Sequence, residues 1–145
     1  MTEFTSEIKI IPYSDEVIFP VLSDLSKLEL VRDRLPEDKL EKMKNFSCDR
    51  DSFTVSVDPV GSIRFVIVER EPNSTIKLQG EKLPFDINMW VQLKAKSETE
   101  TAMKLTVKVN LNPFLKPMLS KPLQEGIAKV ADTLARLPYD QISSL

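Results

Sequence analysis

Two alternating segments near the end of the chain constrain the fold more than any other feature of the sequence. In residues 87–95 and 103–111, apolar side chains occupy every second position and mostly polar side chains stand between them. A period of two is typical of a strand with one buried face. The polar segment 97–100, Ser-Glu-Thr-Glu, joins the two, so together they predict an antiparallel hairpin.

The same period appears earlier in the chain. Apolar residues alternate in Phe53–Val57 and Ile76–Leu78, and residues 58–61 and 71–74 have the composition of turns. Ile63–Glu69 is nearly all apolar or β-branched, so both faces of this strand are expected to be covered. Consecutive strands with short turns predict an antiparallel meander.

The beginning of the chain predicts one more strand and two short helices. Residues 4–11 alternate, which places Phe4, Ser6, Ile8 and Ile10 on one face of a strand that Pro12 ends. The helices then follow a cap at Ser14 and a capping box at Ser26-Lys27-Leu28-Glu29, and a further turn is expected over Glu37–Lys44.

The last element is a long amphipathic helix. Its apolar residues recur at spacings of three and four, as one continuous stripe: Leu119, Leu123, Ile127, Val130, Leu134 and Leu137. Asn112-Pro113 and Ser120 both fit its start, Pro117 and Pro122 make its entry irregular, and Pro138 ends it.

Composition excludes several classes of function. The 145 residues, 1–145, are expected to form one domain. They include no histidine, one cysteine and three scattered glycines, which argues against a catalytic triad, an imidazole metal site or a phosphate-binding loop. A net charge of -2 with dispersed lysines argues against nucleic-acid binding. No signal peptide or membrane-inserted segment is expected, so a cytoplasmic location is the default.

The order of elements resembles the helix-grip superfamily, which includes START domains, birch-pollen-allergen-like proteins and polyketide cyclase-like proteins (SRPBCC). The resemblance is carried by the opening strand into Pro12, by Val17–Leu25 and by the helix from Leu119 to Leu137. It implies an α+β fold, in which a curved antiparallel sheet of about six strands wraps around the C-terminal helix. Pro20 departs from the usual pattern, and so does Val31–Arg34, where a tryptophan often stands.

The resemblance also implies a cavity between the sheet and the helix. We expect a non-enzymatic protein that needs no cofactor or metal and binds a small hydrophobic or amphipathic ligand, lipid-like or polyketide-like. Periodicity alone fits a filled core equally well. Within the helix, Leu123 is expected near the cavity mouth and Leu134 in closed core. The expected lining consists of Met89, Val91, Leu93, Leu105, Val107, Val109, Leu119, Leu123, Ile127 and Val130.

Two alternative functions stay open. An enzyme of the polyketide cyclase or dehydratase kind would need carboxylates or tyrosines that converge, such as Glu69 with Glu81, or Asp86 placed near Arg64. A protein-interaction module would use the apolar strand Ile63–Glu69.

Two single residues also bear on function. Trp90, which lies opposite the apolar face of its strand, could support a weak homodimer or simply cover the sheet. Cys48 is expected to be a small buried hydrophobe, because no histidine can activate it.

Overall fold

The computed structural model describes residues 2–27, 46–57, 61–83 and 85–142. The second predicted helix, from Ser26, and the turn over Glu37–Lys44 lie almost wholly outside the described residues. In chain order the elements are β1 (Thr2–Thr5), β2 (Lys9–Ile11), α1 (Asp15–Leu22), β3 (Phe46–Cys48), β4 (Ser52–Val57), β5 (Gly61–Glu71), β6 (Thr75–Glu81), β7 (Ile87–Ala95), β8 (Thr101–Val109), α4 (Leu115–Ala135) and α5 (Tyr139–Ile142).

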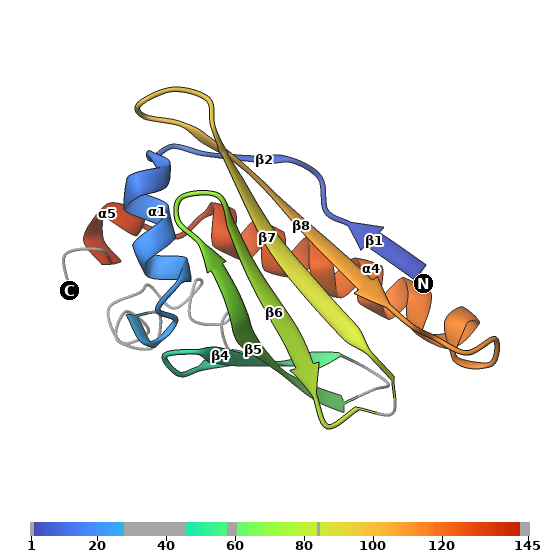
Figure 1. The fold of residues 1–145 in the computed structure, drawn as a ribbon. Helices are drawn as coiled ribbons and strands as arrows, with labels where there is room; N and C mark the ends of the chain where they lie inside the picture. Colours follow the sequence, from blue (N-terminus) through green and yellow to red (C-terminus); the bar gives the residue numbers. More distant parts are fainter. Residues whose placement is uncertain (1, 28–45, 58–60, 84, 143–145) are drawn as a thin grey trace.

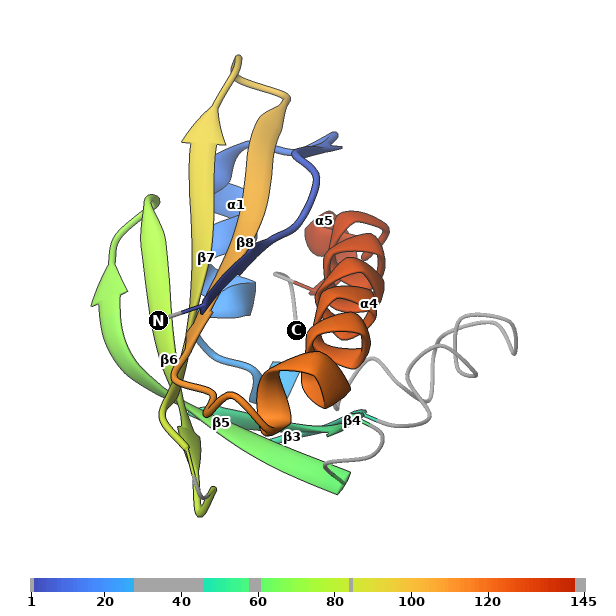
Figure 2. The same ribbon diagram turned by 90° about the vertical axis from the view of Figure 1, so that its right-hand side faces the viewer.

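The strands form one antiparallel sheet that curves around α4 (Figures 1 and 2). Its order is β1-β8-β7-β6-β5-β4-β3, and β2 also pairs with β8. The helix contacts β1, β2 and β8 near one edge of the sheet and β4 near the other. The predicted α+β class is therefore confirmed, with eight strands in the described part of the chain rather than about six.

The predicted hairpin is present as β7 and β8, paired from Ile87 with Val109 to Ala95 with Thr101. The apolar side chains of both strands point toward α4 and are buried: Ile87, Met89, Val91, Leu93, Met103, Leu105, Val107 and Val109.

The apolar stripe of α4 is buried against this face along its whole length, from Leu119 to Leu137 just beyond the helix end. The sequence allows the helix to start at Asn112-Pro113 or at Ser120, and in the structure it starts just after Asn112-Pro113, at Leu115. The Asn112 Oδ1 accepts hydrogen bonds from the backbone N–H groups of Phe114 and Leu115, at 3.0 and 2.9 Å. Pro117 then falls in the first turn, where its missing N–H has no helical partner to lose.

The prediction for residues 4–11 is wrong in its second half. Thr5 pairs with Thr106, but Lys9 pairs with Met103, so four residue steps on the first strand oppose three on β8. One extra residue reverses the faces that follow it. As a result Ile8 and Ile10 are 65% and 48% exposed, and Ile11 is buried instead.

The prediction that both faces of Ile63–Glu69 are covered is also wrong. Ile63, Phe65 and Ile67 point inward and are buried, whereas Val66 is half-buried and Val68 is 48% exposed. The register with β6 shifts between Ile67 and Glu69, which leaves Val68 as the extra residue of a bulge. The apolar outer surface proposed for an interaction module is accordingly reduced.

At the first irregularity, a side chain completes the hydrogen bonding of the sheet. Ser6 is buried, and its Oγ accepts a hydrogen bond from the backbone N–H of Leu105 at 2.9 Å. The Ser6 N–H donates in return to the Leu105 carbonyl, also at 2.9 Å. The hydroxyl thus takes the place of a main-chain acceptor that the extra residue has displaced.

The Ser6→Ala variant should therefore lose about 1–3 kcal/mol of unfolding free energy, because a buried N–H is left without an acceptor. Urea denaturation measures the loss. Ser6→Thr, which keeps the hydroxyl, should recover most of it. Glu7→Ala is the control at a side chain that is 90% exposed, where a change within about 0.5 kcal/mol is expected. Equal stability of Ser6→Ala and wild type would contradict this role.

Candidate functional site

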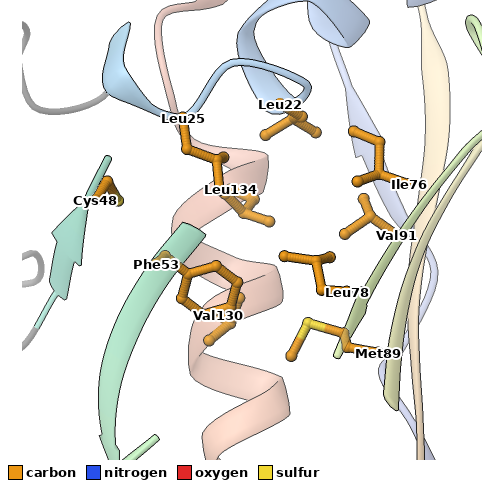
Figure 3. Close-up of a pocket in the computed structure, with 10 residues that line it drawn as sticks. All are labelled: Leu22, Leu25, Cys48, Phe53, Ile76, Leu78, Met89, Val91, Val130 and Leu134. Carbon is orange, nitrogen blue, oxygen red and sulfur yellow. The ribbon is translucent and has the colours of Figure 1, made fainter. Parts of the chain in front are cut away.

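Two small apolar hollows lie between the sheet and α4, within the hydrophobic core. The first has a volume of about 30 Å³ and lies toward α1 and the C-terminal half of α4. In Figure 3, side chains from α1, three strands and α4 converge on it, and Cys48 stands at its outer margin. Its lining consists of Leu22, Leu25, Cys48, Phe53, Ile76, Leu78, Met89, Val91, Val130 and Leu134.

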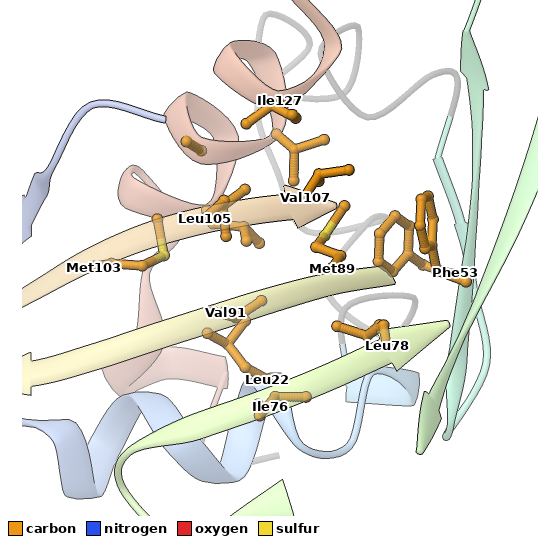
Figure 4. Close-up of a cluster of buried hydrophobic side chains, with 14 of the residues drawn as sticks. Leu22, Phe53, Ile76, Leu78, Met89, Val91, Met103, Leu105, Val107 and Ile127 are labelled. Atoms are coloured by element: carbon orange, nitrogen blue, oxygen red, sulfur yellow. The ribbon is translucent and has the colours of Figure 1, made fainter. Parts of the chain in front are cut away.

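The second hollow, also of about 30 Å³, lies against the middle of α4. It is lined by Ile63, Phe65, Ile87, Met89, Val107, Leu123, Gly126, Ile127 and Val130. Met89 and Val130 line both hollows and stand between them. Figure 4 shows Met89 rising from β7 beside Val107 and the Phe53 ring.

The structure brings six of the ten predicted lining residues to the hollows. Met89, Val91, Val107, Leu123, Ile127 and Val130 line one or both of them. Four others are buried but line neither of the two hollows: Leu93, Leu105, Val109 and Leu119. The expectation that Leu134 lies in closed core is wrong, since it lines the first hollow, and Leu123 lines the second.

The lining predicted from the sequence did not include the residues that β4, β5, β6 and α1 contribute to the hollows. Alternation predicts that Phe53, Ile76 and Leu78 are strand residues, and Phe65 lies in the nearly continuous apolar strand Ile63–Glu69. The sequence pattern shows which side chains of a strand face inward. It does not show that the curvature of the sheet brings these side chains to the same hollows as those of β7 and α4. The two phenylalanines stack, with ring centroids 5.2 Å apart, and belong to paired positions of β4 and β5.

No charged side chain lines either hollow. The largest fully buried polar side chain of the described residues, Tyr139, donates from its hydroxyl to the Leu134 carbonyl at 2.5 Å. Burial raises the pKa of Tyr139 far above its usual value, so the phenol stays protonated. The described groups around the hollows therefore offer a shape and an apolar surface rather than an acid or a base.

The predicted carboxylate constellations are not formed. Arg64 pairs with Glu81 at 2.7 Å and with Asp49 at 3.4 Å, rather than with Asp86. Glu69 lies opposite Lys77, while Glu81 lies opposite Arg64. The two glutamates are thus about 15 Å apart along the strand pair, given about 3.3 Å per residue. All of these side chains lie on the exposed surface, away from the hollows.

Trp90 is on the outer face of β7 and is half-buried. The Lys77 and Lys108 ammonium groups, on the two neighbouring strands, lie 5.5 and 5.6 Å from its ring centroid. These distances are within range for cation–π attraction. The ring therefore covers the sheet together with two lysine side chains, in line with the second interpretation of Trp90.

Among the described residues, no cluster of three or more acidic or cysteine side chains could hold a metal ion. Nor is any helix in the described ranges both long and apolar enough to cross a membrane.

Comparison with known proteins gives a result for structure only. No protein-family model matches the sequence, and no curated protein matches it. A START superfamily protein from Mycobacterium smegmatis superposes with a TM-score of 0.64 at 12% identity, over 98% of this chain and 97% of the other. Norcoclaurine synthase from Thalictrum flavum, in complex with dopamine and hydroxybenzaldehyde, gives 0.67 at 12% identity, over 96% and 87%.

A third similar structure is the Aha1 dimer from Colwellia psychrerythraea, with a TM-score of 0.57 at 17% identity over 94% of this chain and 98% of that chain. These superpositions show a shared fold, but at such low sequence identity a shared fold does not imply a shared activity. The order of the elements, the sheet curved around the C-terminal helix and these structural similarities identify the fold of this chain as the helix-grip fold.

Proposed function

We propose that this protein binds a small apolar or amphipathic molecule between the concave face of the sheet and α4, without transforming it. The observation that carries the proposal is the pair of apolar hollows at this interface. Protein interiors usually pack as densely as organic crystals and contain few voids larger than a water molecule. Apolar cavities also stay dry and take up apolar guests, because water finds no hydrogen-bond partner in them.

The fold comparison supports the binding of a small molecule. The norcoclaurine synthase structure is a complex with dopamine and hydroxybenzaldehyde, so a protein of this fold accommodates small molecules. Catalysis would require an acid or base in contact with the ligand. The hollows here are lined by hydrocarbon side chains, with one thiol at the margin, and the Tyr139 hydroxyl is engaged with a backbone carbonyl. These features favour binding over the cyclase-like alternative.

The direct test is titration with cis-parinaric acid, a slender polyene whose fluorescence rises in apolar surroundings. We expect a saturable rise with one site per chain. Cys48, the only cysteine of the sequence, lines the first hollow and serves as a second reporter. Its alkylation by a maleimide should slow when the probe is bound, and should be insensitive to the probe in urea. A fluorescence rise that never saturates, with unchanged alkylation, would overturn the proposal.

Filling the hollows should raise stability and weaken binding together. Val130→Leu adds one methylene group where both hollows meet, so we expect a gain of about 0.5–2 kcal/mol in unfolding free energy. The affinity for the probe should fall at least about fourfold, the equivalent of one displaced methylene group. Urea denaturation and probe titration measure the two effects.

The matched control is Val21→Leu in α1. Val21 is fully buried and lines neither hollow, so the same added methylene should destabilise by about 1–3 kcal/mol through overpacking. If Val130→Leu loses as much stability as Val21→Leu does, then the space next to Val130 is not free in solution.

A further inference from the structure

The two hollows are too small to hold a ligand separately. Each has about 30 Å³, and a single water molecule already needs about 10–15 Å³ of such space. A molecule of several carbon atoms fits only if the two become one space. This inference rests on the proposed function, since it asks how the same site opens and what it admits.

The separation depends on two side chains that line both hollows, Met89 from β7 and Val130 from α4. They differ in stiffness. Valine is branched at Cβ and holds one rotamer in a helix, whereas methionine has three rotatable bonds and fills irregular gaps. Met89 pairs with Leu78 on one side and Val107 on the other, so its backbone is held in the middle of the sheet. Motion is therefore available to its side chain alone.

The joined space would be long and narrow. Leu123 lines the second hollow and Leu134 the first, and eleven residues of α-helix span about 16 Å. The neighbours of Met89 around this space include Val91, Val107 and Val130, all β-branched and buried. Because these side chains are stiff, rotation of Met89 opens a passage only about as wide as one unbranched side chain.

We infer that Met89 divides a single elongated site and selects for ligands with an unbranched aliphatic chain, which lies along α4 once the methionine side chain moves aside. The absence of charged groups from the lining suits a hydrocarbon chain without polar substituents. A wide fused-ring molecule would need several stiff side chains to move at once, so the site selects against it.

The experiment compares Met89→Ala with Leu93→Ala. Leu93 is on the same strand and the same face, is buried, and lines neither hollow. Bound cis-parinaric acid is displaced by octanoic, dodecanoic and hexadecanoic acids, and by cholesterol sulfate as the wide molecule. Met89→Ala should bind the two longer acids at least about tenfold tighter than wild type, with little change for octanoic acid. Leu93→Ala should bind all three acids as wild type does.

Two further measurements do not depend on the alanine variant. Met89→Leu keeps the size of the side chain but adds a branch, so it should weaken binding of the long acids at least about fivefold. In methyl-labelled methionine NMR of the wild type, the Met89 resonance should move when dodecanoic acid is added. The resonance of Met118, which is 58% exposed, should stay in place.

The outcomes distinguish the dividing role of Met89 from the binding of a ligand as such. If the wild type binds the acids but Met89→Ala and Leu93→Ala behave alike, with a static Met89 resonance, the dividing role is wrong and the binding function stands. If the wild type binds cholesterol sulfate as tightly as hexadecanoic acid, the ligand class is wrong. If wild type and variants bind none of the probes, the proposed function itself fails.

Discussion

The apolar stripe of α4 can leave water only if the sheet bends around it, and most of the structure follows from this requirement. A flat sheet would cover a helix along a single line. Here β1, β2 and β8 contact α4 near one edge and β4 contacts it near the other, so the stripe from Leu119 to Leu134 is buried throughout. Burial of apolar surface is the dominant favourable term in folding, which makes this contact the organising one.

The bent sheet is irregular at two places, where one strand has an extra residue relative to its partner. One lies between β1 and β2, where the Ser6 hydroxyl accepts the Leu105 N–H in place of a main-chain carbonyl. The other is Val68 in β5. Each bulge increases local twist and reverses the side-chain faces beyond it. The exposed Ile8, Ile10 and Val68 are direct consequences of this geometry.

The same geometry leaves the space in which we place the ligand. A curved sheet and a helix do not match everywhere, and small hollows remain between them. Met89 and Val130 line both hollows. A site of this kind recognises a guest by shape and by its lack of polar groups, since no charged side chain lines it. Its selectivity therefore depends on how far individual side chains can move.

The sequence predicts the β7–β8 hairpin and the buried stripe of α4, because each is a periodic pattern within one segment, and the order of such segments predicts the α+β class. It also placed Met89, Val107 and Leu123 on the inward faces. Tertiary structure alone decided that Phe53, Leu78 and Leu22 reach the same space, that Ile10 points outward, and that Arg64 pairs with Glu81. The physical reason is that periodicity assigns each side chain to a face of its own element. Which elements share a space, and where one extra residue reverses a face, is set by pairing between segments that are distant in the sequence.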